Sequence, residues 1–511
     1  MFFNLFGQKH TCKRGFDGLK KGDKFHFIAM GGVGQSALAK ILLKLGYEVS
    51  GSDINDSKYL KELKSLGAKV FVGHNADNVP SDCFIVLSSA IKENNPELIK
   101  AKELGLTILH RSDLLLAITH EFPLTIGFAG THGKTTTSGL ASYVLSKMKA
   151  KAAYAVGGII PEINTNADAS KDSNVFAAEL DESDGTIVKY SPEILVINNL
   201  EADHLDFYKN GLDDVIETFK GLILKLHSDS KIIVNADNGG VLELLSSFID
   251  IPLKQKVVKF SVISPDVSLK DSASAAKHDF TADVSAQNLI FNEVGAEFDV
   301  IYQNKNLGKI STSLKGIHNV YNALAVAASL LEAGFKFKDF APHFKGFTGM
   351  GRRFQTVFKN ENTEIIDDYA HHPSEIKATL KAAAEYKLKS GKDKVVAIFQ
   401  PHRYTRLKAL WEDFMTSFND CDTLFVVDTY SAGDEFDPEF NSENFVKLFK
   451  EKNPSKDIYY VKGKIAETPL DIMEKIQKNA KSIILTLGAG DITKLGMLLS
   501  EELGKKLSKE D

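Results

Sequence analysis

Short apolar runs alternate with longer amphipathic segments along most of the chain. The runs predict buried strands at 25–30, 48–50, 84–88, 107–109, 124–129, 175–180, 194–198, 231–235, 395–399, 423–427, 458–461 and 483–487. Strands separated by helical segments are typical of βαβ units and parallel sheets. The pattern therefore predicts an α/β protein built from several such units.

The pattern changes over residues 281–314. Apolar and polar positions alternate there, with turn residues at Asn292-Glu293 and Asn304–Asn306, which predicts an antiparallel insertion. A helical pattern follows over Ile317–Glu332 and stops before Gly334, a residue type favoured just past the end of a helix.

The length and the three series of strands predict three domains, because a chain of 511 residues holds roughly three units of about 150. We place boundaries near 122 and 347. The expected architecture is a Rossmann-like N-terminal domain (1–122), a central phosphate-loop ATPase-type domain with the antiparallel insertion (123–347), and a doubly wound C-terminal α/β domain (348–511).

Composition narrows the class of protein. Hydrophobic residues make up 43% and charged residues 25%, the usual balance of a folded soluble chain. The net charge of -5 argues against a general nucleic-acid or membrane-surface binder, and no apolar run is long enough to enter a membrane. Cys12, Cys83 and Cys421 lie far apart, which favours a reducing compartment. We expect a cytoplasmic monomer or homodimer whose partners are small molecules.

A glycine motif, Gly32-x-Gly34-x-x-Ala37, follows the first predicted strand and opens a helix. Glycines there allow backbone N–H groups to approach a diphosphate at the positive helix end. Asp53 follows a second strand, where an acidic residue could meet a ribose hydroxyl. The motif predicts a nucleotide-diphosphate site, and the alternative is a glycine turn that only packs a helix on a sheet.

The most specific motif is GTHGKTT (130–136), which lies between a predicted strand and a helix. Its members are Gly130, Thr131, His132, Gly133, Lys134, Thr135 and Thr136. Backbone N–H groups of such a loop cradle nucleotide phosphates, the lysine neutralises phosphate oxygens, and the Thr135 hydroxyl can bind magnesium. The spacing departs from the strict phosphate-loop pattern, because position 128 is Phe rather than Gly.

Acidic residues follow the next two strands. They are Glu179, Asp181, Glu182 and Asp184 after one strand, and Glu201 and Asp203 with His204 after the other. The carboxyl ends of parallel strands meet at one edge of a sheet, so these groups could complete a magnesium–ATP site. Each carboxylate taken alone is more often solvated or a helix cap.

The last third of the chain carries histidines and arginines in three segments: Arg352-Arg353, DDYAHHP (367–373) and QPHRYTR (400–406). Arg403 and Arg406 share a face if residues 403 onward are helical, and paired guanidinium groups suit a carboxylate or phosphate. Without the other motifs, this segment is a basic helix start of unknown purpose.

Together these motifs resemble the Mur ligase family, ATP-dependent enzymes that add amino acids to peptidoglycan precursors. The matching segments are AGTHGKTTT (129–137), AELDESDG (178–185), NLEADHLD (199–206), GIHNVYNA (316–323), GRRF (351–354) and DDYAHHPSEI (367–376). IAMGGVGQSALA (28–39), QPHRYTR and DTYSAGDE (428–435) look most like the branch that adds L-alanine to UDP-N-acetylmuramate.

The resemblance implies a role for each candidate residue. The first loop would bind the UDP-sugar through Gly31, Gly32, Gly34 and Ser36, with Asp53, Ser88 and Arg111 nearby. ATP would meet residues 130–136, His318, Asn319, Asn322 and Arg353. Magnesium would be held by Thr135, Glu179 and His204, with Glu182 as the competing carboxylate. Tyr369, His371, Arg403 and Arg406 would form the amino-acid pocket. Some relatives carry a carbamylated lysine at the position that is Phe219 here, so we expect no such group.

The implied reaction is the formation of an acyl phosphate followed by its aminolysis, with Lys134, His204, His371 and Arg403 as the catalytic residues. Lys134 and magnesium would neutralise the approach of a carboxylate to the γ-phosphate, and His371 is a candidate general base. Three alternatives remain at this stage. They are a recycling ligase that attaches a tripeptide to the same sugar nucleotide, an NAD-dependent oxidoreductase built on the first glycine loop, and an ATP-gated sensor or scaffold.

Overall fold

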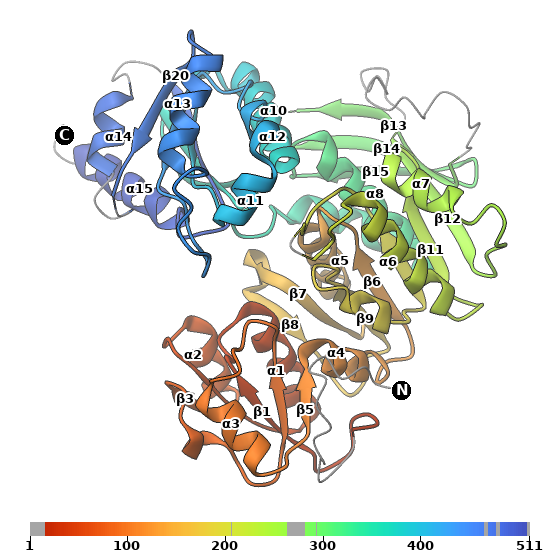
Figure 1. Ribbon diagram of the computed structural model, residues 1–511. Coiled ribbons are helices and arrows are strands. Elements are labelled where there is room, and N and C mark those ends of the chain that lie inside the picture. Colours follow the sequence, from red (N-terminus) through yellow and green to blue (C-terminus); the bar gives the residue numbers. More distant parts are fainter. Residues whose placement is uncertain are drawn as a thin grey trace.

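The computed structural model describes residues 16–205, 207–262, 282–292, 294–463, 465, 469–476 and 481–507. Its strands form three sheets that follow one another along the chain (Figure 1). Cys12 lies outside the described residues. Within them, no helix is both long and apolar enough to cross a membrane.

The N-terminal sheet is parallel, with strand order β3-β2-β1-β4-β5. Its strands are β1 (Lys24–Ile28), β2 (Glu48–Asp53), β3 (Lys69–Val72), β4 (Phe84–Leu87) and β5 (Ile108–His110). The helices between them are α1 (Val33–Leu45), α2 (Lys58–Ser65), α3 (Pro96–Glu103) and α4 (Arg111–Thr119). This alternation of strand and helix is the Rossmann-like arrangement expected from the sequence.

The central sheet has ten strands in the order β15-β14-β13-β12-β11-β10-β6-β9-β7-β8. The strands are β6 (Thr125–Ala129), β7 (Ala152–Ile160), β8 (Thr165–Asp168), β9 (Val175–Glu179), β10 (Ile194–Ile197), β11 (Lys231–Asn235), β12 (Lys256–Val262), β13 (Val284–Phe291), β14 (Ala296–Tyr302) and β15 (Lys305–Thr312). Its helices are α5 (Lys134–Lys147), α6 (Leu212–Lys225), α7 (Gly239–Ser246), α8 (Ile317–Glu332) and α9 (Phe337–Phe340).

The predicted antiparallel insertion is present as β13, β14 and β15. It is not a separate sheet, because β13 pairs in parallel with β12 and so extends the central sheet. The antiparallel pair β7 and β8 lies at the other end of that sheet. The sequence pattern did not predict this pair, since β7 is rich in alanine and glycine rather than in β-branched residues.

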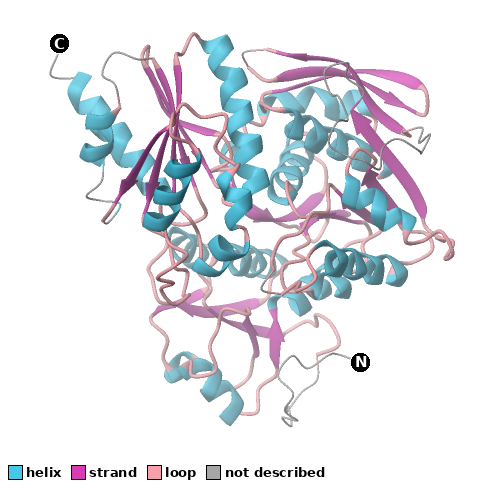
Figure 2. Ribbon diagram, turned by 45° about the horizontal axis from the view of Figure 1, so that its top comes forward, coloured by secondary structure: helices cyan, strands magenta, loops and turns pink. Residues whose placement is uncertain are grey.

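The C-terminal sheet has the order β16-β17-β21-β18-β19-β20, with only β16 antiparallel to its neighbour. Its strands are β16 (Gln355–Lys359), β17 (Thr363–Asp368), β18 (Lys394–Phe399), β19 (Thr423–Val427), β20 (Asp457–Val461) and β21 (Ser482–Leu487). Its helices are α10 (Pro373–Ser390), α11 (Tyr404–Ala409), α12 (Trp411–Met415), α13 (Ser442–Lys452), α14 (Pro469–Lys475) and α15 (Thr493–Leu507). Figure 2 shows this sheet between helices on both faces.

The hydrophobic cores do not follow the three sheets one to one. A single cluster of buried side chains runs from Phe25 in β1 and Leu38 in α1 to Phe176 in β9 and Leu195 in β10. The C-terminal sheet has two clusters of its own, one on each face. The first two sheets therefore share one apolar cluster, whereas only the partly buried Leu205 among the described residues of the central domain packs against the clusters of the third.

Candidate active site

The phosphate loop connects β6 to α5 and depends on two glycines with a left-handed backbone. Gly130 has φ +125°, and a Cβ there would lie 2.8 Å from the Asn199 carbonyl oxygen. Gly133 has φ +80° at the N-cap of α5, and its Cβ would lie 2.6 Å from Asn322 Oδ1. Other residues would therefore strain the loop and push its backbone away from a bound phosphate.

Lys134 is held by the loop itself and by one carboxylate. Its Nζ donates to the carbonyl oxygens of Gly130 at 2.7 Å and Thr131 at 2.9 Å, and to Glu182 Oε1 at 2.8 Å. Glu182 is 1% exposed, and burial raises its pKa to about 7 although Lys134 opposes the shift. The lysine is thus kept beside the loop in a largely buried ion pair.

The acidic groups after β9 divide between two positions. Glu179 accepts a hydrogen bond from Thr135 Oγ1 at 2.9 Å and another from the Gly157 N–H at 2.8 Å. Glu182 Oε2 is buried and has no hydrogen-bond partner within the described part of the chain. A buried carboxylate oxygen without a donor fits a hard cation such as magnesium, and so does a carboxylate bonded to a threonine hydroxyl.

His204 adds an imidazole to this edge of the sheet. Its backbone has φ +52°, and its Nε2 lies 3.7 Å from Asp203 Oδ2 and 3.9 Å from Glu182 Oε1. Burial lowers the pKa of His204 below its ordinary value, so the ring is neutral and able to bind a metal at neutral pH. Among the described residues, no group of three or more His, Cys, Asp or Glu side chains is arranged as a metal site by itself.

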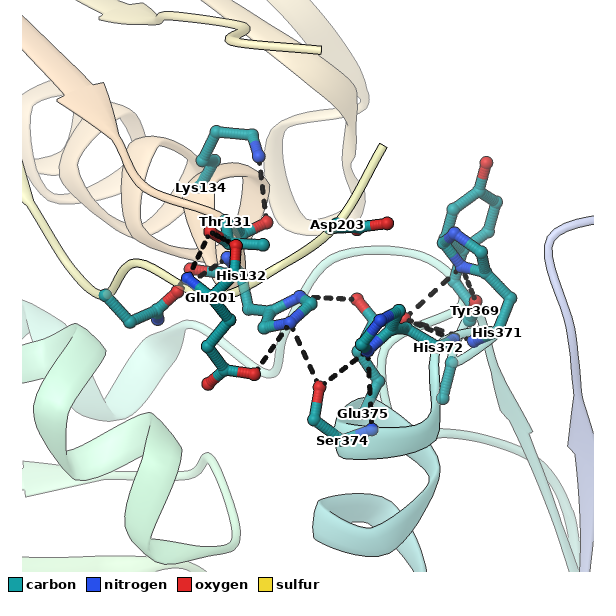
Figure 3. Close-up of polar contacts among 12 residues, drawn as sticks. Thr131, His132, Lys134, Glu201, Asp203, Tyr369, His371, His372, Ser374 and Glu375 are labelled. Atoms are coloured by element: carbon teal, nitrogen blue, oxygen red, sulfur yellow. Dashed lines mark hydrogen bonds and ion pairs between the residues drawn. The ribbon is translucent and has the colours of Figure 1, made fainter. Parts of the chain in front are cut away.

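His132 connects the phosphate loop to the C-terminal domain (Figure 3). Its Nε2 lies 3.3 Å from Glu201 Oε2 and 3.0 Å from Ser374 Oγ, and its Nδ1 lies 3.4 Å from Glu375 Oε1. Burial alone would lower the pKa of His132, but the two carboxylates outweigh it and raise the pKa to about 10. A protonated His132 therefore bridges two domains.

The expected adenine-side residues are grouped behind the loop. Asn322 Oδ1 accepts from Thr137 Oγ1 at 3.1 Å, and its amide donates to Asn319 Oδ1 at 3.0 Å. His318 is exposed, and its Nε2 lies 3.1 Å from Asn319 Nδ2. Arg353 reaches the same interface from the C-terminal domain, with Nη1 3.6 Å from Glu375 Oε1. His318, Asn319 and Asn322 thus lie on α8, which approaches the phosphate loop at Gly133, and Arg353 lies near His318.

The histidine and arginine segments meet at the ends of β17 and β18. The His371 ring lies 5.2 Å from that of Tyr369 and 5.9 Å from that of His402. Arg406 Nη1 lies 3.3 Å from His402 Nδ1, and its Nη2 lies 3.9 Å from Asp203 Oδ1 in the central domain. Arg403 precedes α11 with φ +67°. The structure therefore groups Tyr369, His371 and Arg406 around His402, and Arg403 is the residue that follows His402.

Burial keeps both pocket histidines neutral. It lowers the pKa of His371 to about 4 and that of His402 to about 3. The sequence motifs do not distinguish His402 as a pocket residue, although it lies in the same segment as Arg403 and Arg406. Its ring stacks on Tyr430 with centroids 5.5 Å apart, a contact between distant segments that no local pattern predicts.

The first glycine loop is held by Asp53. Its Oδ2 accepts from the Gly31 N–H at 2.9 Å, and a Cβ on Gly31 would lie 2.7 Å from Leu60 Cδ1. Gly32 caps α1, which also contains Gly34. Ser36 is buried and its hydroxyl donates to the Val33 carbonyl oxygen at 2.9 Å, so in this conformation it bonds within α1.

Two further expected substrate contacts differ in their surroundings. Arg111, at the start of α4, donates to Asp181 Oδ2 at 2.5 Å and so connects the N-terminal domain to the acidic segment after β9. Ser88 is partly exposed just beyond β4. Arg111 therefore lies near the phosphate-loop site, whereas Ser88 lies at the carboxyl edge of the first sheet.

Comparison with known proteins identifies three family domains, which follow one another along the chain in the same order as the three sheets. Three family models match in sequence: Mur ligase family, catalytic domain (24–123), Mur ligase middle domain (128–330) and Mur ligase, glutamate ligase domain (352–490). The UDP-N-acetylmuramate–L-alanine ligase of Geotalea daltonii is 36% identical over 485 residues, covering 94% of this chain and 98% of that protein. The enzyme of the same name from Sulfurihydrogenibium sp. is 36% identical over 484 residues, covering 94% and 98%.

Solved structures are similar over the same length. The UDP-N-acetylmuramate–alanine ligase of Thermotoga maritima has a TM-score of 0.73 at 26% identity, covering 94% of this chain and 99% of that chain. A murein peptide ligase from Psychrobacter arcticus has a TM-score of 0.66 at 21% identity over 94% and 99%, a likeness of fold alone. The motifs, the three sheets and these relatives agree, and this chain belongs to the Mur ligase family.

Proposed function

We propose that this protein joins L-alanine to UDP-N-acetylmuramate, with conversion of ATP to ADP and phosphate, as a step in making peptidoglycan precursors. Relatives that bear this activity in their names match it over nearly the whole of both chains. The observation that carries the proposal is the contact between the phosphate loop and the C-terminal domain that contains the expected amino-acid pocket. In this contact, His132 Nε2 lies 3.0 Å from Ser374 Oγ. A cytoplasmic location is part of the proposal.

Each domain is assigned one substrate. The UDP-sugar belongs to the N-terminal domain (1–122), where Asp53 shapes a glycine loop at the start of α1. ATP belongs to the central domain (123–347), with its phosphates on residues 130–136. L-Alanine belongs to the C-terminal domain (348–511), where Arg403 and Arg406 suit its carboxylate.

The reaction has two steps in this assignment. A carboxylate oxygen of the sugar nucleotide attacks the γ-phosphorus of ATP, which forms an acyl phosphate and releases ADP. The amine of alanine then attacks the acyl carbon, and phosphate leaves as the amide forms. Lys134 neutralises phosphate oxygens during the first step. We assign His371, which burial keeps neutral, as the acceptor of the amine proton in the second step.

Magnesium is the cation that we propose for the acidic residues that follow β9 and β10. Thr135, Glu179 and His204 would hold it together with phosphate oxygens, and the unpartnered Glu182 Oε2 supports Glu182 as a further ligand. When bound, the ion would screen the negative charge of the phosphates from the attacking carboxylate.

Phosphate release tests the proposal directly. The purified protein is given ATP and magnesium, with UDP-N-acetylmuramate and each amino acid added singly and together. Release that needs both co-substrates, is fastest with L-alanine and stops on chelation of magnesium is the expected result. Faster release with a tripeptide than with alanine would instead identify a recycling ligase. Release that needs no acceptor would identify an ATP-driven switch, and NADH binding without UDP-sugar binding would identify an oxidoreductase.

A further inference from the structure

His372 is a buried histidine beside the site that the reaction described above does not use. It is the N-cap of α10 and is 6% exposed. Its Nδ1 accepts a hydrogen bond from the Ser374 backbone N–H at 3.4 Å and lies 2.8 Å from Ser374 Oγ. A backbone N–H can only donate, so Nδ1 is the ring nitrogen without a hydrogen.

The tautomer of His372 follows from this contact. Burial lowers the pKa of His372 below its ordinary value, so the ring is neutral and its single N–H is on Nε2. Within the described residues, Nε2 is buried and has no hydrogen-bond partner. Burying a donor without an acceptor is unfavourable, so we expect an acceptor to reach Nε2 at another stage.

The position of His372 indicates what kind of acceptor this is. Its ring lies 5.3 Å from the ring of His132 in the phosphate loop, and Ser374 Oγ lies between the two rings (Figure 3). It stands at the positive end of an 18-residue helix, where anions are stabilised. On the other side, the adjacent His371 faces the amino-acid pocket. In the proposed reaction, the anion that passes between the nucleotide and the amino-acid pocket is the phosphoryl group being transferred.

We infer that His372 Nε2–H donates a hydrogen bond to an oxygen of the phosphoryl group as it passes from ATP to the carboxylate of the sugar nucleotide. Ser374 and His132 are positioning residues: Ser374 occupies Nδ1, and His132 holds Ser374 from the opposite domain. The donor is therefore correctly oriented only while the phosphate loop and α10 are docked. The inference rests on the proposed ligase activity.

The side chains around His372 support a neutral donor rather than a second cation. Asp203, Glu201 and Glu375 act on its ring electrostatically, as does His132. His132 already carries the positive charge that pairs with Glu201 and Glu375. Lys134 supplies the cation on the nucleotide side, so His372 adds a directed hydrogen bond from the other domain.

The test is His372→Asn, because asparagine keeps the cap acceptor at the Nδ1 position but has no donor at the Nε2 position. We expect kcat for alanine-dependent phosphate release to fall about 10²–10³-fold. The KM values for ATP and alanine and the Tm should change little. In a single turnover without alanine, ADP formation should slow by the same factor. Ser374→Ala should lower kcat by about tenfold with KM unchanged.

Asn441→Ala is the matched control for the loss of a cap. Asn441 caps α13 in the same domain by accepting from the Asn444 N–H at 3.0 Å, so this variant should lower Tm and leave kcat unchanged. A His372→Asn enzyme with kcat within threefold of wild type would overturn the inference, and so would slowing of only the alanine-dependent step. Failure of the wild type to need UDP-N-acetylmuramate and alanine would instead overturn the proposed function.

Discussion

Lys134→Met is the most informative single change in the phosphate loop. It removes the ammonium group but keeps an unbranched side chain of similar length. The loss of one cation from the γ-phosphate site should lower the rate of phosphate release about 10²–10³-fold, which corresponds to about 3–4 kcal/mol of transition-state stabilisation. The fold should survive, because the glycines and Asn199 that shape the loop are untouched.

The stability of this variant should depend on pH through Glu182. The carboxyl is 1% exposed, and burial already raises its pKa to about 7 with Lys134 present. Without the lysine this pKa rises further, so the folded variant stays protonated above pH 7 while the unfolded chain is ionised. In that range the variant should lose about 1.4 kcal/mol of stability per pH unit relative to wild type.

The assay is thermal unfolding of both proteins at pH 6 and pH 8.5, together with phosphate release at pH 7.5. Lys231→Met is the matched control, since Lys231 pairs with the buried Glu332 at 2.9 Å in the same domain but away from the loop. It should lower Tm and leave the rate per folded molecule unchanged. A Lys134→Met enzyme with a normal rate, or with the same Tm deficit at both pH values, would refute this reasoning.

Three further predictions concern the other parts of the site. Arg406→Ala should raise the KM for alanine about 10–100-fold and leave the KM for ATP unchanged in the phosphate-release assay, because a charged hydrogen bond is lost. Gly31→Ala should raise the KM for the UDP-sugar without affecting that for ATP, since the new Cβ would meet Leu60 at 2.7 Å. Two carboxylates raise the pKa of His132 to about 10 against the effect of burial. Protonated His132 therefore stabilises the folded state, and this contribution is complete below pH 6.5. Between pH 6.5 and 10 this contribution should fall by about 1.4 kcal/mol per pH unit, and Tm scans should show no such slope in His132→Gln.

Local patterns predicted the fold class, the order of elements and the segments with chemistry. The helix expected over Ile317–Glu332 has those bounds, because its apolar periodicity and the following glycine both act within a few residues. The loop at 130–136 could be located for the same reason: the glycines and the lysine perform their roles within a single strand–loop–helix unit. The fold class and the family are confirmed.

The contacts between domains could not be predicted in this way. His132 and Ser374 are 242 residues apart in the sequence, and nothing near either residue indicates the other. The family resemblance implies a role for His371 and none for His372, and only the structure shows that the His372 ring lies beside His132 of the phosphate loop. The roles assigned to individual site residues stay predictions until the variants above are measured.

The packing of α1 against the central sheet has a calorimetric consequence. Lys40, 2% exposed, donates to Thr165 Oγ1 at 2.9 Å and Asn166 Oδ1 at 3.0 Å, and Asn166 donates to the Val33 carbonyl oxygen at 2.9 Å. These bonds join β8 to α1, which lie next to each other in Figure 1. The surrounding apolar cluster is continuous between the two domains. Three sheets should therefore melt as two cooperative units in differential scanning calorimetry, one comprising the first two domains and one the C-terminal domain.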